Sequence, residues 1–152
     1  MIYTKKRLSL CASLIVLNLL FIWINSLLPR EVSAAFSKLV GTVIGWLFPG
    51  PATPAEGEGH GILRKIAHFA EFCSLGMLLS WLTRMTCEKK WQYIAIPLVS
   101  GVAAAAIDET IQLFVPGRGP HIRDVGIDSL GVLMGIAILW GIALRKKRMK
   151  VK

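Results

Sequence analysis

The run LSLCASLIVLNLLFIWINSLL, residues 8–28, contains no charged side chain. As a helix it is long enough to cross roughly 30 Å of hydrocarbon. Three basic residues, Lys5, Lys6 and Arg7, precede it. Val32-Ser33-Ala34 resembles the cleavage motif of a signal peptide, but the run exceeds the about 7–15 residues typical of a signal-peptide hydrophobic region. We therefore predict an uncleaved first membrane span.

Three further apolar segments follow in this chain of 152 residues, of which 54% are hydrophobic. We predict membrane-spanning helices over residues 8–28, 62–85, 91–115 and 124–144. The link between the last two contains the turn 116–120, whose prolines and glycines cannot continue a helix. The sequence thus predicts a single all-α domain over residues 1–152, an integral membrane bundle of four transmembrane helices.

A different kind of helix is predicted between the first and second spans. Over residues 32–48, small residues recur at every fourth position and larger apolar residues occupy the other side. This spacing is typical of an amphipathic helix that lies in the membrane interface. Residues 49–61 are rich in Pro and Gly and are predicted to form a loop.

The distribution of basic residues predicts the orientation of the bundle. In the four-span arrangement, 12 of the 18 Lys and Arg residues fall on one side of the membrane: Lys5, Lys6, Arg7, Arg84, Lys89, Lys90, Arg145, Lys146, Lys147, Arg148, Lys150 and Lys152. Because basic segments stay in the cytoplasm, both termini are predicted to be cytoplasmic and the interfacial helix extracytoplasmic. A fifth span over residues 32–48 would place the basic C-terminus outside and is disfavoured.

Cysteine usage and charge argue against several other classes of protein. Cys11, Cys73 and Cys87 are scattered and form no CxxC pair, which argues against a disulfide scaffold and a zinc finger. A net charge of +9 would suit nucleic acid, but no DNA- or RNA-binding motif accompanies the basic residues. We expect no nucleic-acid partner, and membrane lipids are the simpler partner of these charges.

Ionisable residues interrupt the second predicted span. Lys65, His68 and Glu71 are spaced three apart, so their side chains project toward one face of the helix. At about 1.5 Å per residue, His68 lies roughly 9 Å below Ile62. Charge at that depth is expensive and usually faces a partner, a cavity or a substrate. The imidazole there could transfer a proton, bind a metal or donate to Glu71.

The third and fourth predicted spans carry polar residues at the same end of the bundle. Asp108, Glu109 and Gln112 are spaced so that all three can reach the bundle interior. Asp124 and Asp128 open the last span one turn apart. Adjacent carboxylates in a low dielectric require cations, and the candidates are Lys65, Arg118 and Arg123, with Arg64 and His121 nearby.

Two glycines follow these carboxylates in the last span. Gly131 and Gly135 are four residues apart and would let another helix approach closely.

Several of these residues also have a purely structural interpretation. Asp124 precedes an apolar run, which is the usual position of an N-cap. Lys65 could extend to lipid headgroups, and Arg118 could be solvated in its turn. His68 could be a hydrogen-bonded core histidine. The concentration of ionisable groups in one membrane layer nevertheless favours a functional cluster, with a structural network as the alternative.

Three segments together resemble the VanZ-like membrane protein family. They are RKIAHFAEF at 64–72 with Leu75-Gly76, DETIQLFVPGR at 108–118, and Asp124 with Gly131. The resemblance covers about residues 62–140, and it implies these characteristic polar positions: Lys65, His68, Glu71, Asp108, Glu109, Gln112, Arg118 and Asp124. It also implies a bacterial cell-membrane protein, since the family takes its name from a protein associated with teicoplanin resistance. This chain has Asp128 where many members carry Asn.

The resemblance supplies no established biochemical activity, and three functions are compatible with the sequence. The favoured one is binding of a lipid-linked cell-envelope molecule, or of a lipoglycopeptide, at the outer leaflet. An intramembrane enzyme with His68 or Glu109 as general base, and carboxylates around a divalent metal, is the first alternative. A small proton-coupled transporter is the second. The predicted ligand-binding residues are Lys65, Glu71, Asp108, Gln112, Arg118, Arg123, Asp124 and Asp128.

No nucleophile elbow, HExxH motif or P-loop favours a particular enzyme class. The sequence identifies neither a cofactor nor a metal, and an oligomer is one of the states that it leaves open.

Overall fold

The protein is a bundle of helices in the computed structural model, which describes residues 5–29, 31–33, 35, 39, 42, 58–118 and 121–149. The helices are α1 (Lys5–Leu27), α3 (Glu58–Thr86), α4 (Gln92–Gln112) and α5 (Ile122–Met149). All four are long and apolar enough to cross a membrane. The prediction of an all-α fold with four membrane-spanning helices is therefore confirmed.

The predicted interfacial helix, residues 32–48, lies mostly outside the described residues. Within it the structure describes Val32, Ser33, Ala35, Leu39 and Thr42, which are helical. The interfacial helix therefore stays a prediction. The loop predicted over residues 49–61 also lies largely outside the described part, and its last residues, from position 58 onward, belong to α3.

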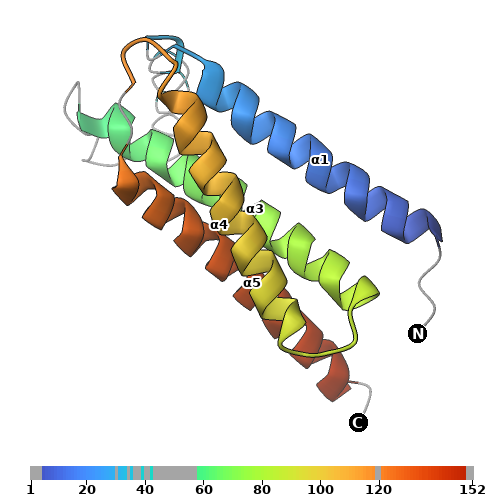
Figure 1. Ribbon diagram of the computed structural model, residues 1–152. Helices are drawn as coiled ribbons and strands as arrows, with labels where there is room; N and C mark the ends of the chain where they lie inside the picture. Colours follow the sequence, from blue (N-terminus) through green and yellow to red (C-terminus); the bar gives the residue numbers. More distant parts are fainter. Residues whose placement is uncertain are drawn as a thin grey trace.

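Helix α3 is the centre of the bundle (Figure 1). It packs most extensively against α5 and also contacts α4 and α1, while α1 contacts α4 as well. The apolar core is formed by side chains from all four helices: Cys11, Ile15, Ile22, Phe72, Leu75, Ala104, Ala105, Val132 and Ile136. Many large apolar side chains, such as Phe21 and Val99, instead point outward, as a surface in contact with lipid requires.

Glycines allow the close contact between α3 and α5. A Cβ atom added at Gly131 would lie 2.6 Å from the backbone oxygen of Phe69, and one added at Gly135 would overlap the backbone oxygen of Cys73. The predicted close approach at these two glycines is confirmed. Gly141, farther along α5, has nothing within 4 Å of its Cβ position.

The two ends of the bundle differ in chemistry. One end holds the start of α1, the link between α3 and α4, and the end of α5 (Figure 1). The exposed basic residues Lys5, Lys89, Lys90 and Arg145 lie there. The opposite end holds the end of α1, the link between α4 and α5, and the start of α5, and the ionisable residues singled out in the sequence gather near it.

Candidate functional site

The centre of the candidate site is formed by His68 of α3, Asp108 of α4 and Asp128 of α5. These side chains are buried, at 6%, 0% and 3% exposed respectively. His68 Nδ1 lies 3.8 Å from Asp108 Oδ2. One nitrogen or oxygen atom from each of the three residues lies within 4.8 Å of the others. The structure thus brings together one residue from each of three predicted spans.

Glu71 lies one turn along α3 and connects this centre to α1. Its Oε2 is 3.9 Å from His68 Nδ1, and its Oε1 accepts a hydrogen bond of 2.9 Å from the Asn25 amide. A contact of 3.9 Å is too long for a hydrogen bond, so Asn25 is the closer partner of Glu71.

Gln112 fixes the position of the Asp108 carboxylate. Its amide nitrogen lies 2.9 Å from Asp108 Oδ2 and 3.4 Å from the hydroxyl of Ser26 in α1. Both Gln112 and Ser26 are buried. Because an amide NH₂ group has two donors, Gln112 can hold both oxygen atoms at once and joins α4 to α1.

Arg64, Lys65 and Asp124 form the partly exposed entrance to the cluster. Lys65 Nζ lies 3.0 Å from Asp124 Oδ1, and Arg64 Nη2 lies 3.9 Å from Asp124 Oδ2. Arg64 Nη2 also lies 3.5 Å from Gln112 Oε1. Because Gln112 holds the Asp108 carboxylate, this contact connects the entrance to the buried centre. Asp124 lies inside the first turn of α5, since that helix begins at Ile122. Its carboxylate therefore pairs with cations of α3, and it is not at the N-cap position considered from the sequence.

Arg118 fixes the end of α1. Its guanidinium donates to the backbone oxygens of Ser26 at 2.9 Å and of Asn25 at 3.4 Å. These carbonyls belong to the last turn of α1, where the regular helical donors run out, and the Asn25 carbonyl also accepts a hydrogen bond of 3.3 Å from the backbone N–H of Leu28. Burial lowers the pKa of Arg118, and Arg64 lowers it further while Asp108 raises it. Arginine nevertheless stays protonated in proteins, so this side chain remains a cation.

Glu109 and Arg123 form no hydrogen bond or ion pair with the three residues of the buried centre within the described part of the chain, although Glu109 is itself buried, at 8% exposed. The Glu109 carboxylate accepts a hydrogen bond from the backbone N–H of His121, which ties the end of α4 to the start of α5. Among the residues that the structure describes, the ion-pair partners of His68 are Glu71 and Asp108, and Glu109 is not one of them. Arg123 is exposed and pairs with no carboxylate in the described ranges.

The structure adds a polar face of α1 that the sequence interpretation missed. Asn18 donates to the Ser74 hydroxyl at 2.6 Å. Asn25 donates to the Glu71 carboxylate, and the Ser26 hydroxyl accepts from the Gln112 amide. Asn18 and Asn25 are seven residues apart and therefore share one side of a helix. That spacing of two amides within an otherwise apolar run is the sequence signal for this face, although the run contains no charged side chain.

Several buried polar atoms at the centre have no hydrogen-bond partner among the described residues. They include His68 Nδ1, Asp108 Oδ1 and Glu71 Oε2. Buried polar atoms are normally satisfied, so their grouping here indicates a place where a proton or an ion can be held. His68, Asp108 and Asp128 have the donor atoms for a metal ion.

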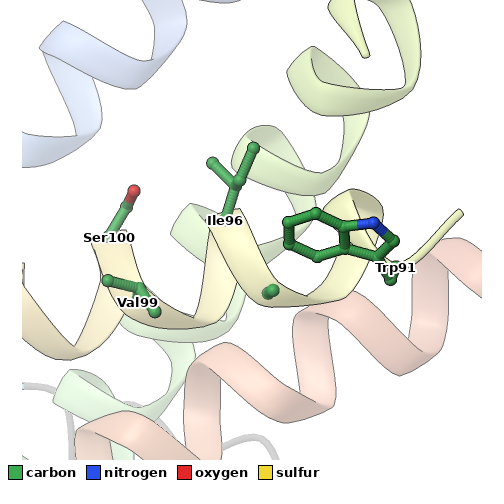
Figure 2. Close-up of a pocket in the computed structure, with 5 residues that line it drawn as sticks. Trp91, Ile96, Val99 and Ser100 are labelled. Atoms are coloured by element: carbon green, nitrogen blue, oxygen red, sulfur yellow. The ribbon is translucent and has the colours of Figure 1, made fainter. Parts of the chain in front are cut away.

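An apolar hollow lies along the first half of α4 and shares no lining residue with this cluster. It is lined by Trp91, Ala95, Ile96, Val99 and Ser100 (Figure 2). Trp91 and Val99 are strongly exposed, and no ionisable side chain lines the hollow. A surface of this kind on a membrane helix suits a lipid chain and lacks the groups needed for chemistry.

Comparison with known proteins gives one match. The model of the VanZ/LLP1 family matches residues 6–144, which is nearly the whole chain and extends the resemblance to include α1. No curated protein and no solved structure matches the chain significantly.

Proposed function

The chain belongs to the VanZ/LLP1 family, and we propose that it binds an anionic lipid-linked cell-envelope molecule, or a lipoglycopeptide, at the outer leaflet of the bacterial membrane. The observation that carries this proposal is the arrangement of the entrance. Lys65 is 46% exposed and lies above a buried polar cluster to which all four helices contribute. A cation at this level can be reached by the headgroup of a lipid.

The distribution of charge supports an outward-facing entrance. Lys5, Lys89, Lys90 and Arg145 lie at the opposite end of the bundle from Lys65. Because basic residues favour the cytoplasmic side, this distribution favours an entrance that faces the outer leaflet.

The surroundings of Lys65 suit an amphiphile. Ile66, the next residue, is 58% exposed, and Ile122 at the start of α5 is 88% exposed. In the proposed complex the anionic group replaces Asp124 as the partner of Lys65, and the hydrocarbon chain lies along these apolar side chains. A charge-assisted contact to phosphate or carboxylate gives the headgroup its specificity.

The test compares two lysine variants of the full chain in lipid nanodiscs. The probe is a long-chain polyprenyl phosphate, and the neutral polyprenol of equal length is the control ligand. Lys65→Ala should weaken binding of the phosphate by about threefold to tenfold, since half-exposed charge contacts contribute about 1 kcal/mol. Lys89→Ala, which changes an exposed lysine at the opposite end, should leave binding unchanged.

Equal affinity of both variants for the phosphate, or equal affinity of the wild-type protein for the phosphate and the alcohol, would contradict the proposal. His68→Gln should retain most of the binding, because His68 is buried below the entrance. Product formation that requires His68 or Glu109 would instead replace binding with catalysis. In cells, the same binding predicts that expression of the chain raises tolerance to teicoplanin, and that Lys65→Ala reduces this effect.

A further inference from the structure

We propose that His68, Asp108 and Asp128 form a binding site for one divalent transition-metal ion, of the Mn²⁺ or Zn²⁺ class. This inference does not rest on lipid binding, because the three side chains lie below the entrance formed by Arg64, Lys65 and Asp124.

The donor atoms and their spacing fit such an ion. Imidazole nitrogen together with carboxylate oxygen is a ligand set used for divalent first-row metals. With bonds of about 2.0–2.2 Å, two ligands of one ion lie roughly 3–4.4 Å apart. His68 Nδ1 and Asp108 Oδ2 are 3.8 Å apart, and the full set lies within 4.8 Å. Small rotations of the side chains would close the remaining difference.

Unpartnered atoms at the same place give independent support. His68 Nδ1 and Asp108 Oδ1 are buried and accept or donate no hydrogen bond within the described part of the chain. His68 is 6% exposed and Asp108 is 0% exposed, so both side chains are shielded from bulk solvent. A buried nitrogen and a buried oxygen that lack partners have lone pairs available to a metal.

The charges around the site also favour a bound cation. Lys65 and Arg64 pair with Asp124, and the guanidinium of Arg118 is bound to backbone carbonyls. Among the described residues, no Lys or Arg lies within ion-pairing distance of Asp108 or Asp128. Two carboxylates this close in a low dielectric need a bound cation or a proton.

The hydrogen bond from Gln112 prepares Asp108 to act as a ligand. It uses one lone pair of Oδ2, at 2.9 Å, so that Oδ2 keeps a second lone pair, while Oδ1 has no hydrogen-bond partner among the described residues. Groups that hold a ligating carboxylate in this way orient it toward the metal.

The test uses the full chain in nanodiscs of neutral phospholipid, purified without a histidine tag and treated with chelator. Mn²⁺ is the probe, because it prefers oxygen and nitrogen donors and avoids the three cysteines. Titration followed by electron paramagnetic resonance should show about one bound Mn²⁺ per chain. His68→Ala and Asp128→Asn should each weaken Mn²⁺ binding by about tenfold or more. Even the loss of a residue that only orients a metal ligand lowers metal affinity by about tenfold. Glu88→Gln, an exposed acid at the opposite end of the bundle, is the matched control and should bind as the wild type does.

A second measurement does not require the buried variants to fold. The chain has three histidines, so His60→Ala/His121→Ala leaves His68 as the only imidazole. Mn²⁺ bound to this double variant should show magnetic coupling to a ¹⁴N nucleus. Absence of stoichiometric binding, or bound Mn²⁺ without nitrogen coupling, would overturn the metal site. Because no polyprenyl phosphate is present, these results are separate from the test of the proposed function.

Discussion

Replacing Gly131 by Ala tests how tightly α5 must pack on α3 to form the site. The added Cβ would lie 2.6 Å from Phe69 O, whereas ordinary van der Waals contact begins at 3.4 Å. Phe69 O is a backbone atom and cannot rotate away, so one helix must move by about 0.8 Å, the difference between these distances. Gly131 is three residues from Asp128, and Phe69 follows His68, so this movement also disturbs the buried centre.

Gly141→Ala is the matched control, because it changes the same helix where nothing lies within 4 Å. Both variants gain up to about 1 kcal/mol of helix propensity. Only Gly131→Ala also bears the overpacking cost of about 1–3 kcal/mol. We therefore expect Gly131→Ala to be less stable than Gly141→Ala by about 1–3 kcal/mol, which is about 5-fold to 150-fold in the unfolding equilibrium.

Reversible unfolding of the two variants in mixed detergent micelles, followed by circular dichroism, measures this difference. Equal stability of the two proteins would refute the close packing of α5 on α3 at Gly131.

Three further predictions follow from the topology and from the contacts of α1. In a background free of native cysteines, a cysteine replacing Ala55 should react with an impermeant thiol reagent from outside. A cysteine replacing Lys147 should react only after the membrane is opened. The reverse labelling would show that the bundle has the opposite orientation in the membrane. Asn25→Leu should destabilise the protein by about 1–3 kcal/mol, because Glu71 loses its hydrogen-bond donor, and adding Glu71→Leu should restore part of that loss in thermal unfolding. Arg118→Ala should lower the melting temperature and speed proteolysis at the end of α1, whereas unchanged protection would show that its two carbonyl contacts contribute little.

The helical framework could be predicted from sequence because its determinants are local. An uncharged run such as residues 8–28 has no stable alternative to a membrane helix. The close approach at Gly131 and Gly135 also follows from spacing along one helix, whichever helix is the partner. Grouping His68 with Asp108 requires only that adjacent spans run in opposite directions, which places the start of the second span beside the end of the third.

The partners of individual side chains depend on helix rotation and loop conformation, which local spacing does not determine. Arg118 follows α4 in a turn, and nothing in the sequence indicates that it reaches the carbonyls of Ser26 and Asn25 in α1. Either Arg118 or Arg123 is predicted from the sequence to lie close to a carboxylate; Arg123 lies on the exposed side of α5, while its neighbour Asp124 pairs with Lys65.

Site-directed photocrosslinking in native membranes tests the central claim most directly. A photoreactive amino acid replaces Ile66, which is 58% exposed beside Lys65, or Ile142, which is 42% exposed toward the other end of α5. After irradiation, mass spectrometry identifies the lipids bound covalently to each protein. An anionic isoprenoid lipid, or added teicoplanin, should be attached at Ile66 and be depleted when Lys65→Ala is introduced. Attachment of bulk phospholipid alone at Ile66, with the same pattern as at Ile142, would contradict an anion-binding entrance at the outer leaflet.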